Sequence, residues 1–195
     1  MNSKSSTDYP DSPFQNAGWH TAGDRPARRV ISRSRLCNRF KFPSRAAGRM
    51  LHLEGVLEVA AAYWLEALVA QGIVVSYRPQ PGILEMRWSD QQKRYFPDFF
   101  VRTASLGDWL IEAKPLARAA LEQLRAKHCM VRKAAASCGF EFAVWSEHPL
   151  LRQPELTELK RSYHARVAHD SRQFCHRVFA EKTIKEICDD FFTHQ

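Results

Sequence analysis

The order of periodic segments between residues 54 and 144 is the feature that most limits what this chain can fold into. Residues 54–69 predict an amphipathic helix, because apolar side chains recur every three or four positions and Gly72 follows as a stop. Segments of strand character follow at 73–77, 84–88, 94–101 and 109–114, with turn residues between them. A second helix is predicted over 116–137 and a last strand over 140–144. This order of helix, three or four strands, helix and strand predicts an α/β core around a mixed sheet.

The flanks of this core differ from it in composition. Residues 1–27 are rich in polar residues and proline without an apolar period, which predicts a disordered tail. Residues 28–53 are predicted as a basic arm, 54–148 as the core, and 149–195 as a small C-terminal segment that contains only helices. A chain of 195 residues has room for one such core and these appendages.

Positive charge is concentrated before the first helix. The chain has 29 Lys and Arg against 21 Asp and Glu, and nine of the basic residues fall between Arg25 and Leu53 without one acidic residue. Such a segment is suited to contact DNA phosphates, although a solvated linker would have the same composition. The candidate phosphate contacts are Arg28, Arg29, Arg33, Arg35, Arg39, Lys41, Arg45 and Arg49.

The sequence offers no sign of a membrane or secretory destination. Its longest apolar stretches, such as residues 56–65, fall well short of the roughly 20 residues that a spanning helix needs. The first residues lack the pattern of a signal peptide, and five cysteines without C-x-x-C spacing indicate no disulfide framework. We therefore expect a cytoplasmic protein without a membrane partner.

The stretch that carries chemistry is Tyr95-Phe96-Pro97-Asp98-Phe99, followed by Glu112-Ala113-Lys114. On a strand, residues two apart share a face, so Glu112 and Lys114 point the same way. If the Asp98 strand pairs antiparallel with this one, Asp98 can lie beside Glu112. Two adjacent carboxylates repel each other unless a proton or a cation bridges them, and hard oxygen ligands suit Mg²⁺ or Mn²⁺. A lysine beside them could activate water or stabilise charge at phosphorus, which together predicts phosphodiester hydrolysis.

The first helix supplies a third acid. Glu54 and Glu58 lie four residues apart on the side of the helix that should face the sheet. A carboxylate that faces inward without a partner costs several kcal/mol, which a metal or a lysine would relieve. Alternatively, both acids only complement the positive end of the helix dipole.

Four elements of the core in the same order resemble the TnsA transposon endonuclease family, which has a PD-(D/E)xK nuclease core. They are Glu54-Gly55-Val56-Leu57-Glu58, the strand that ends in Gln80-Pro81, Tyr95-Phe96-Pro97-Asp98-Phe99 and Glu112-Ala113-Lys114-Pro115. The likeness covers roughly residues 45–148, and Gly55 stands where the family commonly has serine.

The resemblance implies a Mg²⁺-dependent endonuclease, with Mn²⁺ able to substitute, that cuts the 5′ ends of a mobile element. It implies metal ligation by Glu58, Asp98, Glu112 and the carbonyl of Ala113, with Lys114 as the catalytic lysine. The implied partners are transposon-end DNA, an integrase-like transposase of the TnsB type and an AAA+ regulator of the TnsC type. The implied setting is a bacterial cytoplasm, at the nucleoid when the enzyme is active.

Several alternatives stay open at this stage. Gln80 could direct its amide at the site or at DNA, or it could be structural, because it lies between two prolines. The same core would serve a stand-alone restriction, repair or junction-resolving nuclease. A non-catalytic DNA-binding assembly module with a vestigial acidic site would also share the pattern.

Overall fold

The computed structural model describes residues 17–22, 39–88, 91–151 and 154–164. They form a mixed α/β structure around a four-stranded sheet in the order β4-β7-β8-β9. The strands are β4 (Val74–Pro79), β7 (Phe99–Thr103), β8 (Asp108–Ala113) and β9 (Phe140–Trp145). β8 runs antiparallel to β7 and parallel to β9, so the sheet is mixed, as predicted.

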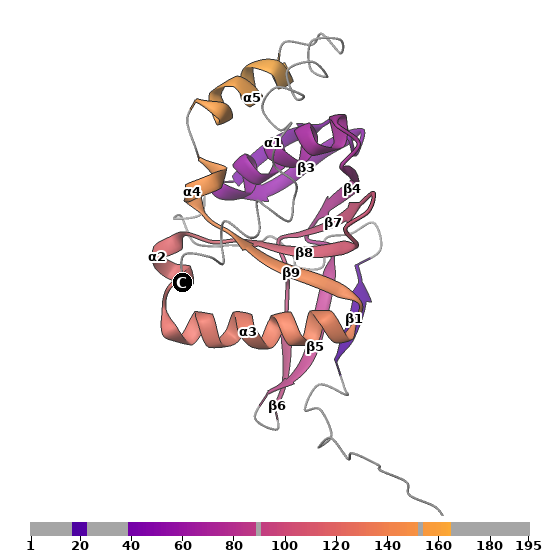
Figure 1. Ribbon diagram of the computed structural model, residues 1–195, viewed down its shortest axis with the longest axis vertical. Helices are drawn as coiled ribbons and strands as arrows, with labels where there is room; N and C mark the ends of the chain where they lie inside the picture. Colours follow the sequence, from indigo (N-terminus) through magenta and orange to yellow (C-terminus); the bar gives the residue numbers. More distant parts are fainter. Residues whose placement is uncertain (1–16, 23–38, 89–90, 152–153, 165–195) are drawn as a thin grey trace, which may run out of the picture.

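One face of this sheet is covered by α1 (Val56–Ala70), the hairpin of β2 (Arg39–Ser44) and β3 (Arg49–Glu54), α4 (Glu147–Leu150) and α5 (Glu155–His164). The other face is covered by α3 (Glu122–Ser137) and a second sheet, in the order β1-β5-β6. Its strands are β1 (Gly18–Thr21), β5 (Gly82–Trp88) and β6 (Gln91–Tyr95), and a short helix α2 (Leu116–Ala119) precedes α3. Figure 1 shows these layers from α5 at the top, through α1 and the central sheet, to α3 and the second sheet.

Successive side chains of β7 point to opposite faces of the sheet, so this one strand packs against both outer layers. Phe99 and Val101 are fully buried against α1, while Phe100 points to the opposite side and packs with the residues under α3. On α1, small side chains at Ala60, Ala61 and Ala62 are buried and let the helix lie close to the sheet. Two separate apolar clusters therefore form, one on each face.

The structure corrects several of the expected boundaries. Residues 18–21, predicted to belong to a disordered tail, form β1 and pair with β5. The predicted strand over 94–101 is two strands in different sheets, because Pro97 has no amide hydrogen and the chain changes sheets there. The predicted second helix is divided at Leu121, whose extended backbone interrupts the helical hydrogen bonds between α2 and α3.

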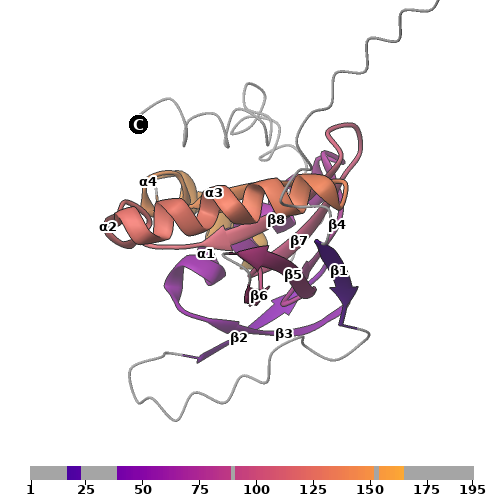
Figure 2. The same ribbon diagram turned by 90° about the horizontal axis from the view of Figure 1, so that it is seen from below.

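The basic arm is also revised. Residues 39–54 are a β-hairpin, in which Phe42, Leu51 and Leu53 are buried in the core shared with α1. Figure 2 shows this hairpin and α3 at opposite margins of the molecule. The remaining residues of the predicted arm, 28–38, lie outside the described residues. The core consequently begins before residue 54.

The predicted C-terminal segment is described only as far as residue 164. There α4 and α5 are helical, and Leu150, Leu156 and Leu159 are buried against the same cluster as α1. Over this part the segment belongs to the core rather than standing apart from it. No helix in the described ranges is both long enough and apolar enough to cross a bilayer.

The contact between β1 and β5 depends on Gly82. A Cβ atom there would lie 2.3 Å from the carbonyl oxygen of His20 and 2.7 Å from Cζ2 of Trp19. We expect Gly82→Ala to lower the free energy of unfolding by about 1–3 kcal/mol, since backbone and an aromatic ring would have to move. Urea denaturation measures this change.

The matched control is Gly18→Ala, on the opposite strand of the same pair. A Cβ atom there would lie 3.5 Å from Nε2 of His20, which is an ordinary contact. Equal unfolding free energies for the two variants would contradict the close approach of β1 to Gly82.

Candidate active site

Two carboxylates lie next to each other where β7 begins and β8 ends. Phe99 pairs with Ile111 in the antiparallel register, which puts Asp98 opposite Glu112. The backbone N–H of Ala113 donates a hydrogen bond of 2.8 Å to Oδ2 of Asp98. The antiparallel pairing expected from the sequence is therefore present, and it brings the two acids to the same edge of the sheet.

Lys114 forms an ion pair with one of these acids, Glu112. Its Nζ lies 2.7 Å from Oε1 of Glu112, whose side chain is 8% exposed. The backbone N–H of Lys114 donates to the carbonyl of Trp145, which fixes the end of β8 against β9. Burial disfavours the ammonium form, but the charges of Glu112, Asp98 and Glu58 outweigh it and raise the pKa of Lys114. The lysine is consequently held as a cation at neutral pH.

The first helix brings the third acid. Glu58 is buried in the first turn of α1, and its carboxylate accepts a hydrogen bond of 2.8 Å from the N–H of Glu54. Its negative charge also acts on Asp98 and Lys114. Glu58 thus has a local partner at the helix start and also contributes to the field at the other two acids.

Glu54 has a different position from the predicted one. It is the last residue of β3, opposite Arg39, and the helix begins only after Gly55. Gly55 has φ 102°, a conformation that glycine adopts readily and other residues rarely adopt. The chain can therefore turn sharply between β3 and α1, and Glu54 is not on the helix.

We call Glu58, Asp98, Glu112 and Lys114 the carboxylate cluster. Burial raises the pKa of Asp98 well above its usual range, and the charges of Glu112 and Glu58 add to this effect. The Ala113 N–H and Lys114 act in the opposite direction without cancelling it. Three carboxylates against one ammonium leave excess negative charge when ionised, so this cluster favours a bound proton or cation.

The donor set fits a hard divalent cation in its chemistry, since carboxylate oxygens are the ligands that Mg²⁺ prefers. Within the ranges that the structure describes, no three His, Cys, Asp or Glu side chains are already arranged as a set of metal ligands. One oxygen of Glu112 is engaged by Lys114, and one oxygen of Asp98 is engaged by Ala113. Ligation by the Ala113 carbonyl, implied by the resemblance, stays a prediction.

Two residues near the cluster were not predicted to belong to a site. The ring of Tyr95 packs edge-on against Phe142, and its buried hydroxyl lies within reach of the Glu112 carboxylate. Burial and the charges of Glu112 and Asp98 raise the pKa of Tyr95. The sequence indicated the closeness of Tyr95 to the cluster only by its position, three residues before Asp98.

His128 is the second of these residues. It is buried, and burial lowers its pKa despite the nearby charge of Glu112. It also lines a cavity of about 530 Å³ between α2, α3 and β9, together with Arg125, Arg132 and Ser146. This cavity therefore adjoins the carboxylate cluster through His128 and carries basic side chains.

Gln80 is fixed to the cluster through its backbone. Its N–H donates a hydrogen bond of 2.8 Å to the carbonyl of Asp98, and its φ of 46° is unusual for a residue other than glycine. The side chain is buried, and Oε1 has no partner among the described residues. A strained backbone and an unsatisfied amide next to Asp98 are features that cluster at functional sites.

The predicted phosphate contacts are placed only in part. Arg28, Arg29, Arg33 and Arg35 lie outside the described residues. On the hairpin, Arg39, Lys41, Arg45 and Arg49 are exposed. Arg45 donates to the carbonyl of Tyr163 and lies over its ring, so it also attaches α5 to the hairpin.

Comparison with known proteins adds no relative: no protein-family model and no curated protein matches this chain.

The pKa of Asp98 leads to a stability prediction. Because the folded state binds the Asp98 proton more tightly than the unfolded chain does, stability falls as the pH rises above about 4, the ordinary value, toward the raised pKa. Asp98→Asn removes the charge that causes this loss. In metal-free buffer at pH 7 we expect it to raise the free energy of unfolding by about 1–3 kcal/mol and to flatten the pH dependence.

Urea denaturation across pH 4–8 measures both effects. The control is Asp108→Asn at the other end of β8, where the acid forms a surface ion pair with Arg102. It should change stability little. A loss of stability in Asp98→Asn at pH 7 would contradict the crowding of negative charge described here.

Proposed function

We propose that this chain is a Mg²⁺-dependent DNA endonuclease with a PD-(D/E)xK-type core, acting as the TnsA-like subunit of a heteromeric transposase that cuts the 5′ ends of a mobile element. The observation that carries the proposal is the carboxylate cluster, in which Asp98, Glu112 and Lys114 come together with Glu58 at one edge of the sheet. These four side chains come from a helix and the ends of two neighbouring strands, as the resemblance implies.

The architecture supports this choice. A mixed sheet, with α1 before it and α3 after the lysine and the short α2, is compatible with a nuclease-like α/β core. The cavity next to the cluster is lined by Arg125 and Arg132 against one acid, Glu122, and this positive balance is consistent with a polyanionic substrate. The assignment to a transposase, with TnsB-type and TnsC-type partners, rests on the four sequence elements.

Each residue of the cluster has a chemical role in this proposal. Asp98, Glu112, Glu58 and the carbonyl of Ala113 would hold Mg²⁺, which when bound supplies a Lewis acid and an activated water for phosphodiester hydrolysis. Lys114 is held protonated by its acidic neighbours, so it acts by donating a hydrogen bond to the charge that develops on the phosphoryl oxygens. Gln80 holds the backbone of Asp98 in place through its N–H.

Removal of single charges should abolish cleavage. We expect Asp98→Ala and Lys114→Ala to lower Mg²⁺-dependent strand cleavage by at least about a hundredfold, because the first removes a ligand of the metal and the second removes the cation beside the phosphoryl oxygens. A gel assay measures the nicking of DNA that contains candidate element ends, with and without a TnsB-type transposase and a TnsC-type ATPase. Unchanged cleavage by both variants would exclude the proposal.

Two glutamates on α1 give a matched test of the third acid. Glu58 and Glu66 are both 7% exposed, but Glu66 accepts hydrogen bonds from Ser44 and Tyr77 within the core. We expect Glu58→Gln to lose cleavage, while Glu66→Gln keeps it and is less stable by about 1–2 kcal/mol. If both variants cut DNA equally well, Glu58 has only a capping role.

Metal binding can be tested without DNA. Saturating Mg²⁺ should stabilise the wild type by about 1–3 kcal/mol through binding to the folded state alone, and Asp98→Ala should lose this gain. Thermal unfolding with and without Mg²⁺, with Mn²⁺ as a second probe, measures it. An equal shift in both proteins would mean that the metal binds elsewhere.

A further inference from the structure

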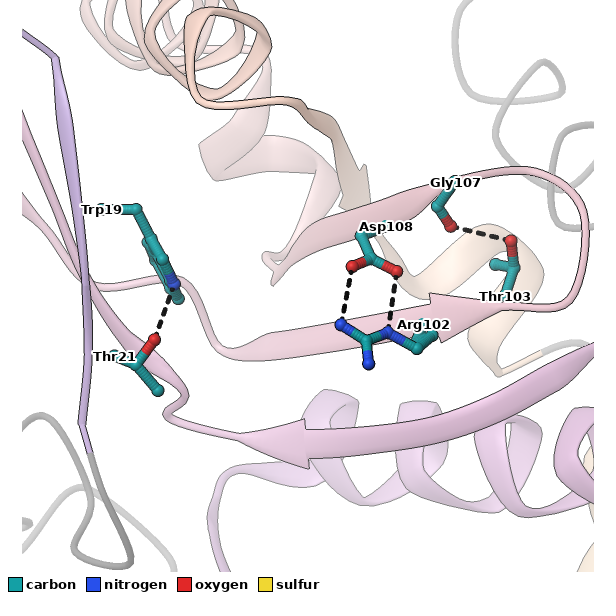
Figure 3. Close-up of polar contacts among 6 residues, drawn as sticks. All are labelled: Trp19, Thr21, Arg102, Thr103, Gly107 and Asp108. Atoms are coloured by element: carbon teal, nitrogen blue, oxygen red, sulfur yellow. Dashed lines mark hydrogen bonds and ion pairs between the residues drawn. The ribbon is translucent and has the colours of Figure 1, made fainter.

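A second pocket lies on the α3 side of the central sheet, beyond the far ends of the strands that carry the cluster. It has a volume of about 580 Å³, within the range of small-ligand sites. We call it the arginine–tryptophan pocket, since it is lined by Trp19, Arg49, Arg78, Phe100, Arg102 and Phe140, among others. Figure 3 shows Trp19 on β1 across from Arg102 and Asp108 on the β7–β8 hairpin.

Positive charge predominates in this pocket. Three arginines line it against one acid, Asp108. Asp108 accepts hydrogen bonds of 3.3 Å from Nε and 3.1 Å from Nη2 of Arg102, which fixes the plane of that guanidinium (Figure 3). Arg78 donates to the carbonyl of Ala22. The guanidinium groups of Arg102 and Arg78 are thus oriented before a ligand arrives, and three arginines against one acid leave net positive charge for an anion.

Aromatic rings lie beside these charges, and the guanidinium of Arg102 is 5.7 Å from the centre of the Phe100 ring. The rings of Trp19 and Phe140 meet edge to face at 5.3 Å, and Phe100 packs perpendicular to Phe140 at 6.0 Å. Trp19 donates from Nε1 to Oγ1 of Thr21 (Figure 3), which fixes its ring. The residue remains half-buried. Arginines beside partly open aromatic rings are what single-stranded nucleic acid requires, since the arginines can contact phosphates while a base stacks on a ring.

The pocket is in line with the carboxylate cluster. Asp98, Phe100 and Arg102 occupy alternate positions and so share one face of the sheet. At about 3.3 Å per residue, Arg102 lies roughly 13 Å from Asp98 along β7. Arg78 pairs with Phe100 on the neighbouring strand, two residues before Gln80. At about 3.4 Å per nucleotide of a stacked strand, a DNA strand leaving the cluster could therefore reach the pocket within about four nucleotides.

We propose that the arginine–tryptophan pocket binds an unpaired nucleotide of a DNA strand, with the base against Trp19 and the phosphate at Arg102 and Arg49. The choice of DNA rests on the proposed function, whereas the pocket's chemistry does not. An unpaired base is required, because the bases of an intact duplex are already stacked and would leave the aromatic rings unused. The pocket would hold a strand that has separated beside the cut.

The test uses the full chain and a fluorescently labelled oligothymidylate of about 10 nucleotides in EDTA, so that binding is measured by anisotropy without cleavage. Arg102→Ala and Arg49→Ala should each weaken binding about five- to tenfold and reduce the salt dependence by roughly one phosphate contact. The matched control is Arg94→Ala on β6. The Arg94 side chain is 65% exposed and pairs with Glu85 at 2.9 Å, while that of Arg102 is 57% exposed and pairs with Asp108 at 3.1 Å.

The aromatic rings have their own pair of variants. Trp19→Ala should weaken binding more than about fivefold, the equivalent of roughly 1 kcal/mol or more of stacking, while Trp19→Phe should stay within about threefold of the wild type. Urea denaturation of each variant separates loss of the pocket from loss of fold. Because Trp19→Phe keeps a ring in place, the comparison stands even if Trp19→Ala loosens β1.

Three results would overturn the inference: equal effects of Arg102→Ala and Arg94→Ala, equal binding by Trp19→Ala and the wild type, or a blunt duplex of the same length binding as tightly as the oligonucleotide. The outcome is separable from that of the proposed function. Binding that depends on Arg102 in a protein that never cleaves DNA would remove the nuclease and leave the pocket. Cleavage that depends on Asp98, with binding indifferent to Arg102, would do the reverse.

Discussion

The antiparallel pairing of β7 with β8 is the constraint on which the rest of the structure depends. It sets Asp98 opposite Glu112 and lets the N–H of Ala113 bond to the Asp98 carboxylate. A shift of one residue in this register would turn one acid to the other face of the sheet and separate the pair. Burial then makes the pairing unfavourable for two ionised acids, and Lys114, the first residue after β8, compensates for only part of that charge. The repulsion between these acids thus destabilises the folded state locally, and the packing around the site compensates for it.

The layers on either side hold this edge of the sheet in place. On one face, α1 brings Glu58 to the acids because Gly55 allows a sharp turn between the hairpin and the helix. On the other, α3 and the β1-β5-β6 sheet enclose Tyr95 and His128 close to Glu112. The same β7–β8 hairpin that carries the acids at one end carries Arg102 and Asp108 at the other. A single pair of strands therefore links the carboxylate cluster to the arginine–tryptophan pocket.

Much of the core followed from local sequence patterns, and the failures have definite causes. The helix at 56–70 and the strands at 74–79, 108–113 and 140–145 lie within a few residues of the predicted bounds. The hairpin at 39–54 was missed because Arg39, Lys41 and Arg49 are its outward-facing residues, and their charge concealed the buried Phe42 and Leu51 on the other face. The strand that contains Tyr95 was joined to that of Phe99, since nothing in the apolar pattern reports a change of sheet, although Pro97 marks the place.

The sequence by itself determined which residues carry charge, which positions favour strand or helix, and that Glu112 and Lys114 share a face, because these properties depend on neighbours along the chain. Only the tertiary structure decided that Asp98 lies opposite Glu112, that Glu58 approaches them from the helix, and that Trp19 faces Arg102 across a pocket. Strand partners and registers join residues far apart in the chain, and they are selected by how whole faces bury apolar area against one another. No local period encodes that selection, so the pocket that β1 completes became visible only in the folded molecule.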